Sequence, residues 1–223
     1  MLTKKGKLTV TLLFLLMIFA ASGIYLSYFS SALKIKSIKV NGLERLSEQR
    51  VLELAQIKID EPLIELDSEL VMNQVLQEKL IKEVEVRKGW PNTVVIEIKE
   101  RKPIALTDLT DGRYLVDETG VAFTRAGPND VHLFVSAPTE AARGLAARVA
   151  KQLPEWLVSE VAIIESFDAK RATVILTSGR KIIWGDEFRT EEKSAVLLVL
   201  LRTVEGDIDI STVEVPVLKV PNS

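Results

Sequence analysis

The chain has very little of the side-chain chemistry on which most enzymes depend. Its 223 residues include no cysteine and a single histidine, His132. Zinc sites and Cys/His or Ser/His dyads therefore lack their usual groups, and we expect His132 to be an ordinary surface or strand residue. The glycines form neither a GxGxxG pattern nor a P-loop. These absences argue against an enzyme, and no cofactor or metal is expected.

Adjacent acidic residues are the remaining candidates for chemistry, because a glycoside hydrolase needs only two carboxylates. The pairs are Asp186 with Glu187 and Glu191 with Glu192. Acidic residues near the start of a helix are explained more simply by the favourable interaction of negative charge with the helix N-terminus. We therefore interpret these pairs as structural.

The balance of charge argues against nucleic-acid binding. The formal net charge is −2, and subtracting the three lysines that precede Leu8 leaves −5 for the remainder. Strong binding to DNA or RNA requires clustered Lys and Arg, whereas both signs are mixed here. Residues 32–103 carry 13 charges of each sign, and residues 104–223 carry 13 basic and 18 acidic residues. This shift predicts a domain boundary near Pro103.

A long uncharged run is the strongest positive signal in the sequence. Residues 8–29 contain no charged residue and no histidine, and Lys4, Lys5 and Lys7 precede them. A helix of this length spans about 33 Å, which matches the hydrocarbon core of a bilayer. We therefore predict a single transmembrane anchor at 8–29 behind a short cytoplasmic head at 1–7.

A cleaved signal peptide is the alternative, because Ala20-Ala21-Ser22-Gly23 resembles a cleavage site. The apolar run continues past these residues, and Tyr25, Tyr28 and Phe29 suit the interfacial belt of an uncleaved anchor. The flanking lysines favour a cytoplasmic N-terminus only slightly, since two more lysines follow the run. The expected arrangement is an anchor in contact with lipid and all further domains outside the cytoplasm.

Residues 32–103 show the pattern of a small sheet covered by two helices. Ser47 and Asp67 are candidate N-caps, each followed by apolar residues at helical spacing. Two alternating segments on either side of a Gly-Trp-Pro-Asn turn predict a β-hairpin. The predicted order is strand, helix, helix, strand, strand, with the helices over one face of the sheet. The strands are expected at 35–41, 84–86 and 94–98.

Residues 104–219 contain more strands than helices. Asp-Gly and Thr-Gly turns predict a meander at the start of this region. Pro154 ends an alanine-rich helix, and Thr190 is a candidate N-cap for a second, nearly uninterrupted apolar helix. The fold class is therefore α+β, with two helices packed on a mainly antiparallel sheet. The strands are expected at 104–109, 113–117, 121–124, 161–164, 173–176, 181–184, 208–211 and 213–219, and the helices at 141–153 and 195–204.

Four motifs follow one another along the chain. The most specific runs from Trp90 to Ala105, with a proline, an alternating strand, Glu-Arg and then Pro-x-Ala. The others are Tyr114-Leu115-Val116-Asp117 leading to Gly120-Val121-Ala122-Phe123, then Gly185-Asp186-Glu187-Phe188 ahead of Glu192-Lys193, and Ile208-Asp209-Ile210-Ser211. Over nearly its whole length, the chain resembles the FtsQ/DivIB family of bacterial cell division proteins.

The resemblance implies a POTRA domain at 32–103 and a β domain at 104–219. It further implies a non-catalytic scaffold in the cytoplasmic (inner) membrane, single-pass and type II, enriched at the division septum. The implied partners are FtsB/DivIC-like and FtsL-like division proteins and other divisome components, with the POTRA domain as one recruitment surface.

The C-terminal residues are the candidate partner-binding site. Residues 208–219 alternate apolar and polar side chains, and Pro216 is expected only at the rim of a sheet. We predict that an extended partner segment adds to this edge as a further strand. The alternative is that the alternation only closes the protein's own sheet. The candidate residues are Ile208, Ile210, Thr212, Val213, Glu214, Val215 and Val217.

Two other functions stay open at this point. A transport or secretion component with a POTRA domain would normally carry repeated units or a barrel, and the sequence contains one such unit. An anchored cell-wall hydrolase would need carboxylates held in a cleft.

Overall fold

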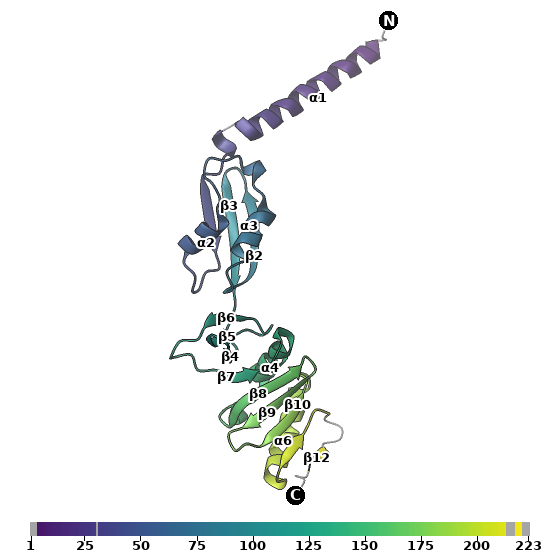
Figure 1. The fold of residues 1–223 in the computed structure, drawn as a ribbon. Helices are drawn as coiled ribbons and strands as arrows, with labels where there is room; N and C mark the ends of the chain where they lie inside the picture. The colour runs from purple at the N-terminus through teal and green to yellow at the C-terminus, as the bar shows by residue number, and fades with distance from the viewer. Residues whose placement is uncertain (1–3, 30, 213–216, 220–223) are drawn as a thin grey trace. The chain divides into compact units, whose positions relative to one another are not determined.

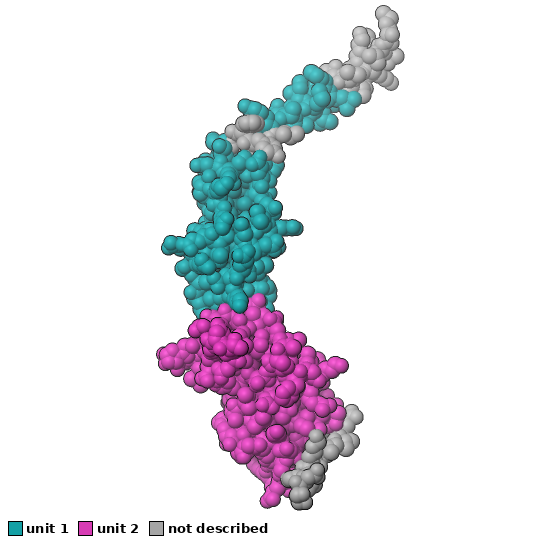
Figure 2. Space-filling model, in the orientation of Figure 1, with its two compact units in different colours: residues 1–100 teal, residues 101–223 magenta. Residues whose placement is uncertain are grey.

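The chain folds into two compact units, residues 1–100 and residues 101–223 (Figures 1 and 2). They are seen in a computed structural model that describes residues 4–29, 31–212 and 217–219. Each unit has its own cluster of buried hydrophobic side chains. The elements of the first unit are α1 (Lys4–Phe29), η1 (Ser31–Leu33), β1 (Ser37–Asn41), α2 (Glu48–Ala55), η2 (Leu63–Glu65), α3 (Ser68–Val75), β2 (Ile81–Gly89) and β3 (Thr93–Glu100).

The uncharged run of the sequence lies within one helix. Helix α1 begins at Lys4 and ends at Phe29, so that residues 8–29 are helical throughout. Among the residues that the structure describes, no helix combines the length and the apolarity needed to cross a membrane.

A three-stranded sheet forms the body of the first unit, in the order β1-β3-β2. Strand β1 runs parallel to β3, and β2 is antiparallel to β3. Alternate residues of β3 are buried under α2 and α3, which cover one face of the sheet (Figure 1). The predicted order of strand, helix, helix, strand, strand is confirmed.

Both predicted N-caps of the first unit are confirmed. The Ser47 hydroxyl accepts a hydrogen bond from the Arg50 backbone N–H at 3.3 Å. The Asp67 carboxylate accepts from the N–H groups of Glu69 and Leu70, at 3.1 and 3.0 Å. These side chains satisfy N–H groups that the first turn of a helix leaves without a backbone partner, so local sequence alone sets where the two helices begin.

The second unit is a nine-stranded mixed sheet, in the order β12-β11-β10-β9-β8-β7-β4-β5-β6. Three of its strand pairs are parallel, namely β4 with β7, β7 with β8 and β10 with β11. The other five pairs are antiparallel, so the sheet is mainly antiparallel, as expected, and mixed. The strands are β4 (Ala105–Leu109), β5 (Gly112–Val116), β6 (Ala122–Arg125), β7 (Leu133–Ser136), β8 (Val161–Asp168), β9 (Arg171–Leu176), β10 (Lys181–Gly185), β11 (Asp207–Asp209) and β12 (Val217–Lys219).

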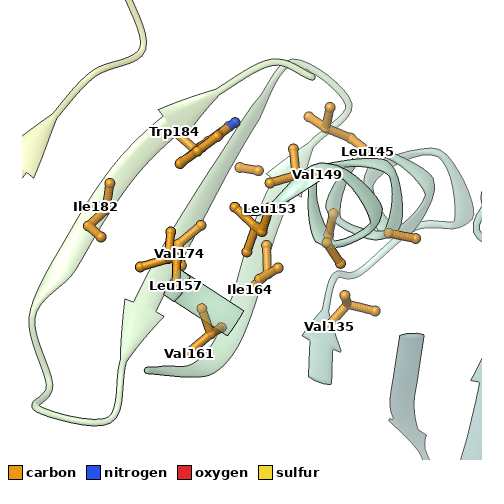
Figure 3. Packing of buried hydrophobic residues seen from close by; sticks show 14 of the residues in the cluster. Val135, Leu145, Val149, Leu153, Leu157, Val161, Ile164, Val174, Ile182 and Trp184 are labelled. Atoms are coloured by element: carbon orange, nitrogen blue, oxygen red, sulfur yellow. The ribbon is translucent and has the colours of Figure 1, made fainter. Parts of the chain in front are cut away.

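Three helices accompany this sheet where two were expected: α4 (Glu140–Gln152), α5 (Glu155–Val158) and α6 (Thr190–Thr203). The additional helix, α5, is a single turn that follows Pro154. Leu145 and Val149 of α4, together with Leu153 just after its end, pack with the sheet residues Ile164 and Val174 in one buried cluster (Figure 3). This packing fixes α4 on the centre of the sheet, since a cluster of close-packed apolar side chains resists displacement.

The predicted N-cap of α6 is wrong. The helix begins at Thr190 itself, and Arg189 occupies the cap position with φ 56° and no side-chain cap. The Thr190 hydroxyl instead donates to the Gln152 side-chain oxygen at 2.8 Å. Gln152 ends α4, so a contact between two helices has replaced the local cap that the sequence favoured.

Candidate partner-binding edge of the second sheet

Strands β11 and β12 form one edge of the nine-stranded sheet. Strand β11 runs parallel to β10, with Ile182 opposite Ile208 and Ile183 opposite Asp209. On its other side β11 pairs antiparallel with β12, where Val217 lies opposite Asp209. Of the described strands, none pairs with the far side of β12. Among the described strands, β12 is therefore the last strand at this end of the sheet, and β11 is an interior strand.

An arginine fixes the entry to β11. Arg180 lies just before β10 and donates through its guanidinium group to the backbone carbonyls of Val204, at 2.7 Å, and Gly206. These carbonyls follow the end of α6, where unpaired oxygen atoms attract a cation. The rigid fork of arginine suits several carbonyls at once. Lys181 N–H donates to the Asp207 carboxylate at 2.9 Å, so the β10 start and the β11 start are tied together.

A buried lysine fixes the connection between β10 and α6. Lys193 is only 2% exposed, and its ammonium group donates to the Asp186 carboxylate at 2.7 Å and to the Asp186 carbonyl at 2.9 Å. A buried ammonium group is costly unless it is paired and hydrogen-bonded, as it is here. Asp186, the first residue of the acidic pair Asp186-Glu187, therefore has a structural role as the partner of Lys193 in α6.

The end of β11 is fixed by a close approach and a side-chain turn. Gly185 has φ +81°, and a Cβ atom there would lie 2.9 Å from the Ser211 Cβ atom. Only glycine fits both conditions without strain. The Asp209 carboxylate accepts from the Ser211 N–H at 3.0 Å and from the Ser211 hydroxyl at 2.7 Å. The chain thus leaves β11 in a defined direction toward Thr212.

The predicted site residues fall into three groups. Ile208 and Ile210 are buried in the core of the second unit, so their side chains support the edge from within. Thr212 is exposed, and Val217 is the first residue of β12. The predicted residues Val213, Glu214 and Val215, together with Pro216, lie outside the described residues.

Sequence reasoning missed the residues that hold this edge in place, which are Arg180, Gly185 and Lys193. Their positions are 26 residues or fewer from their partners along the chain, yet each contact joins different elements. The sequence pointed to two of these residues only through the Gly185-Asp186 motif ahead of Glu192-Lys193. That motif by itself assigned no structural role to either residue. The contacts explain why a glycine, an aspartate and a lysine stand at this spacing.

Helix α6 is packed on one side only. Leu197 is fully buried, and Val196, Leu200 and Leu201 pack against the core. Leu198 and Val199 are exposed, so the apolar sequence of this helix exceeds what the sheet covers. The prediction of a helix packed on the sheet therefore holds for the side of α6 that carries Leu197.

Two family models match the chain in succession. A model described as "POTRA domain, FtsQ-type" matches residues 33–101, and one described as "Cell division protein FtsQ/DivIB, C-terminal" matches residues 105–215. The boundary between the two matches falls next to the division between the two compact units.

Relatives from several bacteria match over most of the chain. The cell division protein FtsQ of Mycobacterium leprae is 30% identical over 214 residues, covering 93% of this chain and 63% of its own. FtsQ of Streptomyces bingchenggensis is 31% identical over 198 residues, covering 81% of this chain and 73% of its own. The chain thus spans less than two thirds of the length of the mycobacterial relative.

A solved structure, the major extracytoplasmic domain of the trans isomer of the cell division protein DivIB from Geobacillus stearothermophilus, is also similar. It is 17% identical and covers 48% of this chain and 99% of its own, with a TM-score of 0.33. That structural likeness is too low to support the fold. The sequence relatives and the two family models are decisive, and they establish that this chain belongs to the FtsQ/DivIB family of bacterial cell division proteins.

Proposed function

We propose that the chain is a non-catalytic scaffold of the bacterial division machinery that binds an extended partner segment along β12. The observation that carries the proposal is the terminal position of β12 in the nine-stranded sheet, with no described strand on its far side. An open strand edge presents a row of N–H and C=O groups, which an added strand can satisfy.

Ile208 and Ile210 are buried, so we do not propose that their side chains touch the partner. Those residues fill the core beneath the edge, so the affinity of a partner strand comes from main-chain hydrogen bonds to β12. Arg180, Lys193 and Asp209 hold β11 in place, and β11 in turn supports β12. A preformed edge favours binding, because the protein has little conformational entropy to lose.

The partners that we propose are those of the family resemblance, FtsB/DivIC-like and FtsL-like division proteins. The POTRA domain is proposed as a second recruitment surface for other divisome components. We further propose that α1 anchors the chain in the inner membrane as a single-pass type II protein at the division septum. The uncharged residues 8–29 support the anchor, because this run matches the thickness of a bilayer.

Proline substitutions test strand addition at β12. Successive N–H groups of a strand point to opposite sides, so Val217→Pro and Leu218→Pro remove donors from opposite edges of β12. In one of these two variants the proline replaces the residue whose N–H points away from β11. We expect that variant to lower capture of an FtsB/DivIC-like partner at least tenfold. The melting temperature of that variant should stay unchanged, since its β11 pairing is intact. Partner capture is measured with the full chain in detergent, and the melting temperature is measured by thermal unfolding of the same sample.

Alanine at the same positions is the matched control. Val217→Ala and Leu218→Ala shorten the side chains and keep both backbone donors, so most of the capture should survive. Full capture by both proline variants would show that the partner does not add to this edge. Loss of capture by the alanine variants alone would assign the affinity to side chains and contradict the backbone mechanism.

A further inference from the structure

Three large apolar side chains of the first unit are exposed close to where its sheet begins. Trp90 is 57% exposed, Ile59 is 50% exposed and Ile64 is 40% exposed. Single exposed apolar residues are common on protein surfaces, but a group of them at one place marks an interaction site. We call these three side chains the apolar tip.

Hydrogen bonds bring the three segments that carry the apolar tip to one end of the sheet. Strands β1 and β3 are parallel and begin together, with Ser37 opposite Thr93, so the hairpin turn that contains Trp90 lies at the start of β1. The Asn92 carbonyl in this turn accepts from the Lys36 N–H at 2.8 Å.

The loop that carries Ile59 and Ile64 joins the same end. Ile35 N–H donates to the Glu61 carbonyl at 2.9 Å, and Asp60 N–H donates to the Ile35 carbonyl at 2.9 Å. From the end of β2, the Lys88 ammonium group donates to the Ile64 carbonyl at 2.8 Å. The loop, the hairpin turn and the residues that enter β1 therefore form one surface.

The chain itself keeps this surface close to the end of α1. Helix α1 ends at Phe29, and Ile35 is already buried in the core of the sheet and its helices. Six residue steps span at most about 20 Å, whatever path the chain takes between them. If α1 is the anchor proposed above, the apolar tip is confined to a thin layer next to the bilayer surface.

The charges of this surface are too balanced to bind lipid on their own. Four basic and three acidic side chains belong to its segments, which leaves a net charge of +1. Lys58 is moreover paired with Glu61 at 3.1 Å. The residues are Lys34, Lys36, Lys58 and Lys88 against Asp60, Glu61 and Glu65. Contact with a membrane would thus depend on the apolar side chains and on the tether, with charge as a minor contribution.

We infer that the apolar tip docks into the interfacial layer of the lipid bilayer, with Trp90 as its centre. Tryptophan is the residue type best suited to this layer, because its ring is apolar and its N–H is polar. The short tether raises the effective concentration of lipid at the tip, so a small apolar surface suffices. This inference rests on the proposed anchor, and it assigns the occupant of the surface as lipid rather than a protein.

Quenching of tryptophan fluorescence by brominated lipid tests the docking. The chain has three tryptophans, of which Trp90 and Trp156 are exposed and Trp184 is fully buried. The full chain is reconstituted in bilayers with bromine on the upper acyl chains and compared with the same bilayers without bromine. We expect bromine-dependent quenching in the wild-type chain, its loss in Trp90→Phe and its retention in Trp156→Phe, which serves as the matched control.

Variants of the two isoleucines give a second measurement with Trp90 left in place. The double variant Ile59→Ser, Ile64→Ser should reduce the quenching of Trp90 at least twofold. Leu76→Ser is the control, because Leu76 is similarly exposed but follows α3, whose chain leads to the opposite end of β2. Circular dichroism of each variant should match the wild-type spectrum, since all of the changed side chains are exposed.

Flotation of the vesicles tests the membrane anchor separately from the docking of the apolar tip. A chain that fails to float with lipid overturns the anchor, and the docking with it. A chain that floats but shows no bromine-dependent quenching, or shows it equally in Trp90→Phe, overturns the docking and leaves the anchor standing.

Discussion

At the scale of single residues, two buried carboxylates explain one of the sequence motifs. Glu100 ends β3, and its carboxylate accepts hydrogen bonds from the backbone N–H groups of Glu44, Arg45 and Leu46, at 2.9 to 3.0 Å. The next residue, Arg101, donates to the buried carboxylate of Asp117. In the Glu-Arg pair of the sequence motif, Glu100 thus makes a structural contact in the first unit and Arg101 makes one in the second.

The hydrogen bonds decide the sign of the pKa shift of Glu100. Burial by itself raises the pKa of this carboxyl group, but the N–H groups of Leu46, Glu44 and Arg45 outweigh burial and lower the pKa below its ordinary value of 4.5. Because the pKa of Glu100 is lower in the folded state, its ionised carboxylate stabilises the folded protein at pH values above the ordinary pKa of 4.5. That stabilisation is lost as the pH falls through the pKa of the folded state.

Replacement of Glu100 by glutamine should reveal this contribution. At pH 7, Glu100→Gln should lower the free energy of unfolding by about 1.5–3 kcal/mol, because a charged acceptor of three N–H groups is lost. The difference from wild type should shrink as the pH falls below 4.5 toward the lowered pKa of the folded state, where the wild-type carboxylate also becomes protonated. Urea unfolding at a series of pH values measures it.

Glu97→Gln is the matched control for that experiment, since Glu97 lies on the same strand with a partly exposed side chain. Its cost should stay below about 0.5 kcal/mol at every pH. An equal cost for both variants would contradict a special role for the buried carboxylate.

At the scale of elements, a close backbone contact in the second unit joins α4 to the turn between β5 and β6. A Cβ atom on Gly144 of α4 would lie 2.5 Å from the Thr119 carbonyl oxygen, and one on Gly120 would lie 2.0 Å from the Glu140 carbonyl oxygen. The Arg143 side chain also donates to the Gly120 carbonyl at 2.6 Å. Helix and turn touch through backbone, so neither glycine has room for a side chain.

Gly144→Ala sets two effects of opposite sign against each other. Alanine stabilises the interior of a helix by about 1 kcal/mol relative to glycine. Forcing a methyl group against a backbone carbonyl costs about 1–3 kcal/mol. We expect the steric cost to win, with a net loss of up to about 2 kcal/mol in the free energy of unfolding, measured by urea unfolding of the full chain.

Gly127→Ala is the control for this prediction. Its added Cβ atom would meet only the Asp130 carboxylate, at an ordinary distance of 3.5 Å. The variant should be as stable as wild type within about 0.5 kcal/mol. A Gly144→Ala variant that is more stable than wild type would mean that α4 can move away from the turn at little cost.

At the scale of the whole molecule, the two units have separate cores, and their stabilities should respond separately. Glu100 belongs to the first unit and Gly144 to the second. The buried side chains of each core come from one side of the division at Glu100. Substitutions that share no partner usually have additive effects on stability.

Combining the two variants tests this independence. In the double variant Glu100→Gln, Gly144→Ala, the costs should add within about 0.5 kcal/mol. Hydrogen exchange read by mass spectrometry should show Glu100→Gln lowering protection only in the first unit and Gly144→Ala only in the second. Protection lost in both units from either single substitution would contradict separate stabilities.

Where a local rule governs, the sequence predicted the element. The caps at Ser47 and Asp67 depend on residues two or three positions away, and the hairpin of β2 and β3 depends on its own turn and alternation. Strand β7 was missed because it has four residues and pairs in parallel with β4 and β8, which are distant in the chain. The cap at Thr190 failed because its hydroxyl bonds to another helix.

The amino-acid sequence by itself determined the order of elements in the first unit, the uncharged run at 8–29 and the family. These follow from periodicity, composition and short motifs, which need no knowledge of distant contacts. Only the tertiary structure decided that β11 lies inside the sheet, that Ile208 and Ile210 are buried in the core, and that Trp90, Ile59 and Ile64 share one end of a sheet. An alternating strand looks the same in sequence whether its apolar face meets its own core or a partner, because the pairing that distinguishes the two is made by residues far away in the chain.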